Sequence, residues 1–112
     1  MKIDMNKLPM KYWNYLTIVN YIQRFIIIHS IIYYELNDNV ISDKDYDSIS
    51  KLLLKLKEED PDTYKKSQYY YVFKDFDGST GFYIYDTLNN NDKKYLIKIA
   101  NHVLYLNKKG VK

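Results

Sequence analysis

Apolar side chains recur at helical spacing along the first third of the chain. Over residues 10–36 they form a wide stripe with few polar interruptions, and Pro9 precedes it. Proline suits the first turn of a helix, where its missing N–H costs no hydrogen bond. The pattern therefore predicts one long helix here, with residues 25–34 deeply buried.

A second helix is expected after the turn-forming residues at 37–39. Ser42 or Asp43 can cap its start, because short polar side chains accept hydrogen bonds from the first free backbone N–H groups. It should end near Glu59, since Asp60 precedes a proline and that position disfavours helical backbone. The side chains predicted to be buried on this helix are Tyr46, Ile49, Leu53 and Leu56.

The third region is rich in residues that favour strands. Residues 69–73 and 82–85 are mostly aromatic or β-branched, and residues 74–81 between them are mostly turn formers. This composition predicts a β-hairpin over residues 68–86. A two-stranded hairpin is barely stable alone, so it should pack on the helices.

A last helix is predicted over residues 91–107, after the cap-forming run at 89–92. Its expected buried stripe comprises Tyr95, Leu96, Ile99, Val103 and Leu106. The predicted fold class is α+β and mostly α: a two-helix hairpin, one β-hairpin and a C-terminal helix. We expect a single domain over residues 1–112.

Composition narrows the functional classes. Apolar residues make up 46% of the chain, which is enough to fold a core, and there is no cysteine for disulfides or thiolate chemistry. The net charge of +3 is mild, and Arg24 is the only arginine, which disfavours base reading in the major groove. Polar residues such as Gln23 interrupt the long apolar segment, so we expect a core helix and no membrane span. No signal peptide pattern opens the chain, which predicts a cytoplasmic location.

No catalytic constellation or metal site is evident. His29 and His102 have no neighbouring serine or histidine at a useful spacing, and His29 is predicted to be a satisfied core residue. Asp75, Asp77, Ser79 and Asp86 depart from a calcium loop, because its glycine position is threonine, and a polar turn is favoured. The chain is therefore expected to be a binding module, neither an enzyme nor a metal protein.

Two neighbouring stretches carry a resemblance: Tyr-Tyr-Glu-Leu at 33–36 and Ile-Ser-Asp-Lys-Asp-Tyr-Asp at 41–47. Together, residues 33–61 resemble the N-terminal subdomain Ia of bacterial NAD-dependent DNA ligases, which binds the nicotinamide mononucleotide half of NAD. By this resemblance Tyr33 matches the stacking tyrosine and Asp43 the first acidic ligand. Tyr46 and Asp47 match the Tyr-Asp pair that opens the second helix. The histidine of the family falls on Tyr34.

The ligase resemblance implies no ligase activity here. Adenylation needs a Lys-x-Asp-Gly motif on a separate large domain, and residues 74–78 contain one residue too many between Lys and Asp-Gly. Joined to residues 69–82, the ligase-like half is similar to small ligase-related proteins of phages and prophages of Gram-positive bacteria. This context predicts an accessory protein in the cytoplasm of a bacterial host.

The leading functional hypothesis is binding of a host macromolecule, above all a host protein, for example as an inhibitor of a defence system such as a CRISPR effector. Tyrosine is abundant, with 14 residues, and suits protein contacts. The candidate contact residues on the predicted hairpin are Tyr69, Tyr70, Tyr71, Asp75, Asp77, Tyr83 and Tyr85.

Two other hypotheses use different surfaces. The first is a module that binds NAD or nicotinamide mononucleotide through Tyr33, Tyr34, Asp43, Tyr46 and Asp47. The second is nucleic-acid binding through the lysine-rich ends of the chain. Its candidate residues are Lys2, Lys7, Lys11, Lys108, Lys109 and Lys112. The sequence leaves the oligomeric state open.

Overall fold

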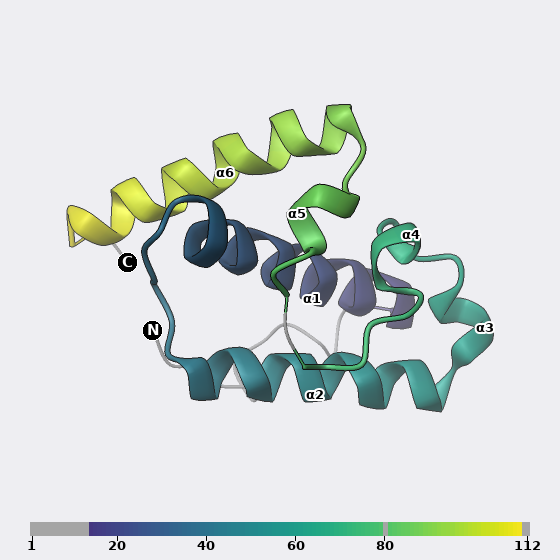
Figure 1. The fold of residues 1–112 in the computed structure, drawn as a ribbon. Coiled ribbons are helices and arrows are strands. Elements are labelled where there is room, and N and C mark those ends of the chain that lie inside the picture. Colours follow the sequence, from purple (N-terminus) through teal and green to yellow (C-terminus); the bar gives the residue numbers. More distant parts are fainter. Residues whose placement is uncertain (1–13, 80, 111–112) are drawn as a thin grey trace.

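Three long helices build the protein, and short helices connect two of them (Figure 1). The computed structural model describes residues 14–79 and 81–110. Helix α1 lies between α2 and α6 and contacts both, while α3 and α4 lie at the end opposite the 36–42 loop (Figure 1). The elements in order are α1 (Tyr15–Ser30), the π-helix η3 (Ile31–Glu35), α2 (Asp43–Glu59), α3 (Pro61–Tyr64), α4 (Tyr70–Phe73), α5 (Ile84–Thr87) and α6 (Asn90–Lys108).

Helix α1 is the centre of the core. Asn14 caps it by accepting a hydrogen bond from the Thr17 backbone N–H at 2.8 Å. Five of its isoleucines are buried among residues of every other helix. Pro9 and the rest of the predicted start of this helix lie outside the described residues.

The end of the first helix differs from the prediction. The backbone N–H of Leu36 donates to Ile31 O, five residues back, which marks the wider π-helical turn of η3. Tyr33 and Tyr34 are 48% and 42% exposed, so the predicted deep burial through residue 34 is wrong. These two tyrosines are exposed because the helix ends with η3. Asn37, with φ of +57°, then turns the chain back.

Helix α2 begins and ends where the sequence predicts. Ser42 is its cap and accepts from the Asp45 N–H at 3.1 Å, and Asp60 follows its last residue, Glu59. Asp60 then caps α3 by accepting from the Thr63 N–H. In the predicted stripe Ile49, Leu53 and Leu56 are buried and Tyr46 is half-buried.

The predicted β-hairpin is wrong, and with it the α+β fold class. Residues 70–73 and 84–87 are the short helices α4 and α5, and the described residues contain no strand. The physical reason lies in the spacing of the side chains that become buried: Tyr69, Val72, Phe73 and Phe76 recur every three or four residues. A strand would bury every second residue, so burial on α1 and α2 overrides the local strand propensity.

Helix α6 occupies the region of the predicted last helix, and Asn89 caps it by accepting from the Asp92 N–H. Only Leu96 and Ala100 are fully buried, because α6 lies on α1 and η3 along one narrow stripe. Tyr95 was expected in the buried stripe but is 51% exposed. Ile99, Val103 and Leu106 are half-buried.

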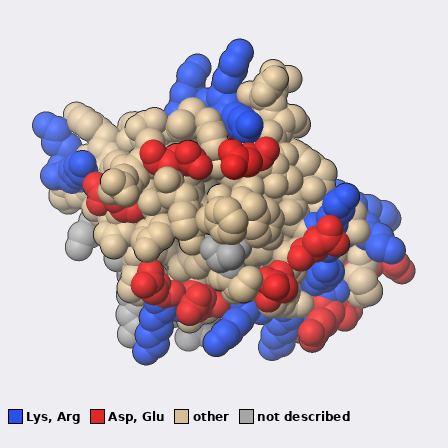
Figure 2. Space-filling view, viewed as in Figure 1, with Lys and Arg blue, Asp and Glu red and all other residues tan. Residues whose placement is uncertain are grey.

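The apolar segment Tyr15–Glu35 passes the length and composition test for a membrane span, but 56% of its most apolar window is buried inside the fold. A core helix has this property. The absence of a membrane span stays a prediction. Figure 2 shows that the middle of the visible face is uncharged, while lysines alternate with acidic residues along its lower edge, over α2.

Candidate functional site

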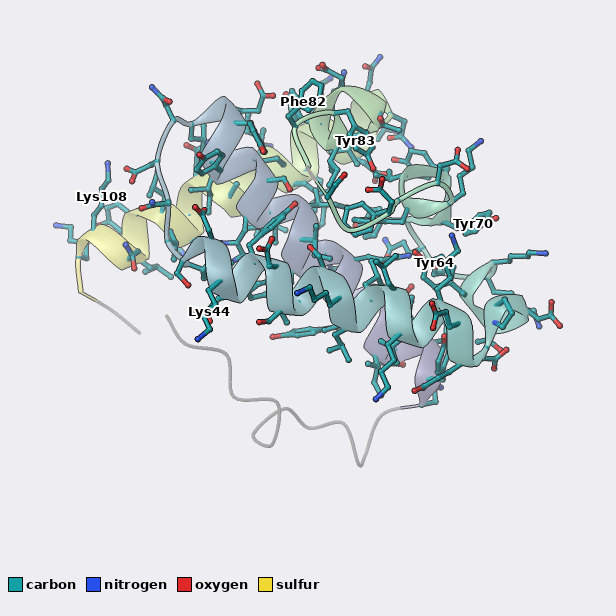
Figure 3. The ribbon with its side chains drawn as sticks, turned by 60° about the horizontal axis from the view of Figure 1, so that its bottom comes forward. Lys44, Tyr64, Tyr70, Phe82, Tyr83 and Lys108 are labelled. Carbon is teal, nitrogen blue, oxygen red and sulfur yellow. The ribbon has the colours of Figure 1, made fainter. Side chains whose placement is uncertain are left out.

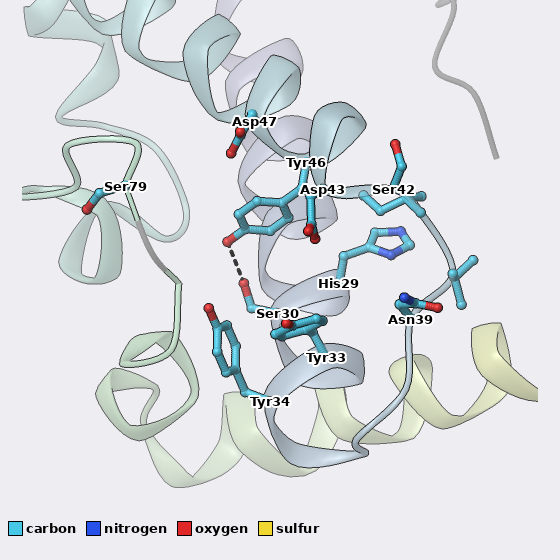
Figure 4. A pocket seen from close by; sticks show the side chains of 12 residues that line it. His29, Ser30, Tyr33, Tyr34, Asn39, Ser42, Asp43, Tyr46, Asp47 and Ser79 are labelled. Atoms are coloured by element: carbon cyan, nitrogen blue, oxygen red, sulfur yellow. Dashed lines mark hydrogen bonds between the residues drawn. The ribbon is translucent and has the colours of Figure 1, made fainter.

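A pocket of about 320 Å³ lies where the end of α1, η3 and the start of α2 meet (Figure 4). The 39–42 loop closes one side, and the loop before α5 reaches another side through Ser79. It is lined by His29, Ser30, Tyr33, Tyr34, Asn39, Val40, Ile41, Ser42, Asp43, Tyr46, Asp47 and Ser79.

All five residues predicted from the ligase resemblance line this one pocket. Tyr33 and Tyr34 are successive residues of the π-helix η3, and both line the pocket. Asp43, Tyr46 and Asp47 stand three and four residues apart on the first turns of α2, which places them on one helical face. Tyr34 lies in the wall of the pocket, and Tyr46 is half-buried.

A hydrogen bond between two hydroxyl groups forms one wall of the pocket. The Ser30 Oγ and the Tyr46 hydroxyl lie 2.8 Å apart, joining α1 to α2 (Figure 4). Burial raises the pKa of Tyr46 to about 12, so this phenol stays protonated at neutral pH. Gly81 approaches the pair so closely that a Cβ there would overlap both oxygens, which explains a glycine at this position.

His29 lines the pocket, although the sequence predicts it only as a core residue. It is 7% exposed, and its Nδ1 atom has no hydrogen-bond partner. Burial lowers the pKa of His29 to about 4, so the imidazole is neutral at pH 7. The prediction of a satisfied core histidine is therefore wrong in its hydrogen bonding. The sequence contains one signal that His29 belongs to the pocket: it lies four residues before Tyr33, on the same helical face.

Asn39, Ser42 and Ser79 are further polar lining residues that sequence reasoning did not connect with the site. Asp77 holds the last of these in place, because its carboxylate accepts from the Ser79 N–H at 2.9 Å and from the Ser79 hydroxyl. These hydrogen bonds hold the pKa of Asp77 below its usual range. Nothing in the local sequence indicates that this turn contacts α2.

The charged side chains in the described lining of the pocket are all acidic. Its described lining contains two aspartates and neither lysine nor arginine. The neighbouring cation, Lys44, projects away from the helices (Figure 3). Among the described residues there is also no group of three or more His, Asp or Glu side chains placed to hold a metal ion. The pocket therefore favours a neutral or cationic organic ligand over an anion.

The predicted partner-binding residues do not share one face, because the hairpin that would align them does not exist. Tyr69 is fully buried, Tyr70 is half-buried on α4, and Tyr83 and Tyr85 are half-buried at the start of α5. Figure 3 shows Tyr70 and Tyr83 on these two different short elements. Tyr71, Asp75 and Asp77 are exposed. The Tyr71 hydroxyl is engaged in the fold, donating to Asp92 at 2.5 Å and accepting from the Asn89 N–H at 3.2 Å.

The lysine-rich ends are only partly described. Lys2, Lys7, Lys11 and Lys112 lie outside the described residues. Lys108 forms an ion pair with Asp38 at 3.3 Å, and Lys109 lies over the Tyr105 ring at 5.6 Å. Nucleic-acid binding through these residues stays a prediction.

Comparison with models of protein families, with curated proteins and with solved structures found no match to this chain.

Proposed function

We propose that this protein is a non-catalytic binding module that holds nicotinamide mononucleotide, or the same half of NAD, in the pocket between η3 and α2. The observation that carries the proposal is that Tyr33, Asp43, Tyr46 and Asp47 line one accessible pocket. These residues are the ones that the ligase resemblance assigns to this ligand. Tyr34 lies beside them, at the position of the family's histidine.

The size of the pocket fits one half of the dinucleotide. Small-molecule sites span roughly 300–1,000 Å³, and this pocket lies at the lower end at about 320 Å³. That volume suits a single ring with its sugar. The adenosine half of NAD would have to remain outside.

The lining also suits the chemistry of a pyridinium nucleotide. The exposed rings of Tyr33 and Tyr34 can attract a cationic aromatic ring through their faces. The carboxylates of Asp43 and Asp47 can accept hydrogen bonds from ribose hydroxyls and offset the ring's positive charge.

The polar groups of the pocket support binding better than catalysis. The Tyr46 phenol has its pKa raised to about 12 by burial, and the His29 imidazole has its pKa lowered to about 4. A general acid or base works best with a pKa near the operating pH. Both groups lie far from that range in opposite directions.

Calorimetric titration of the full chain with nicotinamide mononucleotide tests the proposal. We expect saturable binding, and we expect the Tyr33→Ala/Asp43→Ala variant to abolish it, because it removes a ring and a carboxylate from the pocket. The matched control is Tyr105→Ala/Asp86→Ala, which removes the same groups from exposed positions on α6 and α5. Absence of heat at millimolar ligand, or equal loss in both variants, would contradict the proposal.

Binding of a host macromolecule is a second candidate function, and the exposed rings beside the pocket favour it. The ring centroids of Tyr33 and Tyr34 are 4.8 Å apart, and those of Tyr34 and Phe82 are 6.4 Å apart, with Phe82 60% exposed. Exposed aromatic clusters of this kind are frequent in protein interfaces. A host defence protein that binds the chain should be released by Phe82→Ala and retained by Tyr105→Ala.

A further inference from the structure

His29 leaves a hydrogen bond unmade inside the wall of the pocket. Its Nδ1 has no partner in the described structure and is shielded from water. An unmade hydrogen bond of a buried group destabilises a fold, so such groups are rare and call for an explanation. Protonation of the imidazole does not compensate for the unmade hydrogen bond at neutral pH, since burial lowers the pKa of His29 to about 4.

We infer that His29 is a specificity-determining residue of the pocket, which uses its imidazole together with Asp43 and Asp47 to select a carboxamide-bearing pyridinium nucleoside and leaves any phosphate outside. This inference rests on the proposed function and deepens it. It assigns a role to a residue outside the ligase-like segment.

The position of His29 places it within reach of a bound ring. Figure 4 shows its imidazole near Asn39 and Ser42, across the pocket from the Ser30–Tyr46 hydrogen bond. The final torsion of a histidine side chain has broad, roughly two-fold preferences. The imidazole can therefore turn its unpaired nitrogen toward the pocket without any change in the backbone.

The carboxylates of Asp43 and Asp47 determine which ligand charges bind favourably. The described lining around Asp43 and Asp47 contains no lysine or arginine, so a cationic ring is attracted and an added anion is repelled. A carboxamide carries donor and acceptor groups, and neutral histidine can meet either one. A ring carboxylate in the same place cannot donate, and it would stand near the two aspartates. Among the described lining residues a phosphate would find no lysine or arginine to pair with.

Three ligands that differ by single groups separate these effects in calorimetric titrations of the full chain: nicotinamide riboside, nicotinamide mononucleotide and nicotinic acid riboside. We expect the first two to bind within about threefold of each other, because the phosphate remains outside. Nicotinic acid riboside should bind at least about tenfold more weakly, since its added negative charge lies near Asp43 and Asp47.

The variant that tests the role of the histidine is His29→Leu, which has a similar volume and no polar atom. It should weaken binding of nicotinamide riboside about tenfold while leaving the unfolding midpoint unchanged or higher, because it removes an unmade hydrogen bond. The matched control is His102→Leu on the exposed face of α6, which should alter neither affinity nor stability. The chain has only two histidines, so ¹⁵N-histidine spectra should show one of them shifting on ligand addition.

The outcomes are distinguishable. Equal affinity of the His29→Leu variant and the unmodified chain for nicotinamide riboside would overturn the role of His29 while leaving the proposed function standing. A mononucleotide that binds more than tenfold better than the riboside would overturn the exclusion of phosphate. Failure of all three ligands to bind the unmodified chain would overturn both the proposed function and this role.

Discussion

Two of the buried polar side chains of helix α1, Gln23 and His29, differ in their hydrogen bonding. Gln23 faces the α3–α4 end, and both of its polar atoms are paired: its Nε2 donates to Ser67 Oγ at 2.8 Å, and its Oε1 accepts from the Tyr69 N–H at 3.2 Å. His29, six residues further on, faces the pocket end, and its Nδ1 has no partner.

The difference separates a structural role from a functional one. A buried side chain whose polar atoms are all paired holds two elements in one register, as Gln23 does for α1 and the start of α4. A buried polar group left unpaired beside a pocket contributes nothing to the fold by hydrogen bonding. Variants of the two residues should therefore change different properties of the protein.

The largest effect is expected from Gln23→Leu. This change leaves the Tyr69 N–H and the Ser67 hydroxyl buried without their partner, which should lower the free energy of unfolding by about 3 kcal/mol. Urea unfolding followed by circular dichroism measures it. Affinity for nicotinamide riboside should not change below the midpoint, because the pocket lies at the other end of α1.

Ser67→Ala is the control for this change, since it removes only the smaller of the two partners. It should cost less than Gln23→Leu. A Gln23→Leu variant as stable as the unmodified chain would mean that the buried amide holds nothing in register.

The next largest effect is expected on the free energy of unfolding when the pH is lowered, through protonation of His29. Its pKa is about 4 in the fold, below the usual 6.5, so the unfolded chain binds more protons between these values. The stability contribution is complete above pH 6.5 and is lost as the pH falls toward 4. The loss between pH 7 and pH 5 should be about 2 kcal/mol.

The His29→Leu variant isolates this contribution in urea titrations at pH 7, 6 and 5. The difference in stability between the variant and the unmodified chain should grow in favour of the variant as the pH falls. Carboxylates such as Asp60 and Asp77, whose pKa values are lowered by hydrogen bonds, titrate in both proteins and cancel in the comparison. A difference that is constant with pH would contradict the burial of a neutral imidazole.

Local signals predicted one part of the fold well. Helix α2 has a cap at Ser42, a single apolar stripe and a proline just beyond its end, and each signal depends only on neighbouring residues. The 69–76 segment lacks such signals. Its aromatic residues favour strands locally, and only burial against α1 and α2 selects a helical turn, which the segment alone does not reveal.

The residues of the pocket likewise fall into those that the sequence predicts and those that it does not. The five residues predicted from the ligase resemblance lie within residues 33–47, on η3 and on the first turns of α2, and the loop between these elements brings them to one opening. Ser79 arrives from a loop more than thirty residues after α2 begins, and no periodicity predicts that contact. His29 was hidden by its apolar neighbours, because its sequence context is the same whether or not its nitrogen finds a partner.

A smaller effect is expected where the pocket meets the loop before α5. Gly81→Ala adds a methyl group that overlaps the Tyr46 hydroxyl and Ser30 Oγ, so one of them must move. Overpacking of this size should lower the free energy of unfolding by about 1.5 kcal/mol and also weaken ligand binding. Differential scanning calorimetry and the ligand titration measure the two effects.

Tyr46→Phe tests the cause, because it removes one of the overlapping oxygens. In the Gly81→Ala background, Tyr46→Phe should lower the free energy of unfolding by less than it does in the unmodified chain. Strictly additive losses in the double variant would show that the methyl group is accommodated elsewhere.

The smallest effect is expected at the ion pair that joins the 36–42 loop to α6. Lys108 Nζ lies 3.3 Å from Asp38 Oδ2, but both side chains are open to solvent, at 65% and 35% exposure. Water screens such a pair, and ordering two mobile side chains offsets most of the attraction. Lys108→Ala should therefore leave the unfolding midpoint unchanged within error at low and at high salt, and leave the affinity of the pocket unchanged as well.

If the affinity falls while the midpoint stays constant, the ion pair orders the loop that carries Asn39 and Ser42, and the pocket is then less preformed than its α2 side indicates. A constant affinity means that the backbone of η3 and the cap at Ser42 hold the loop without help from α6.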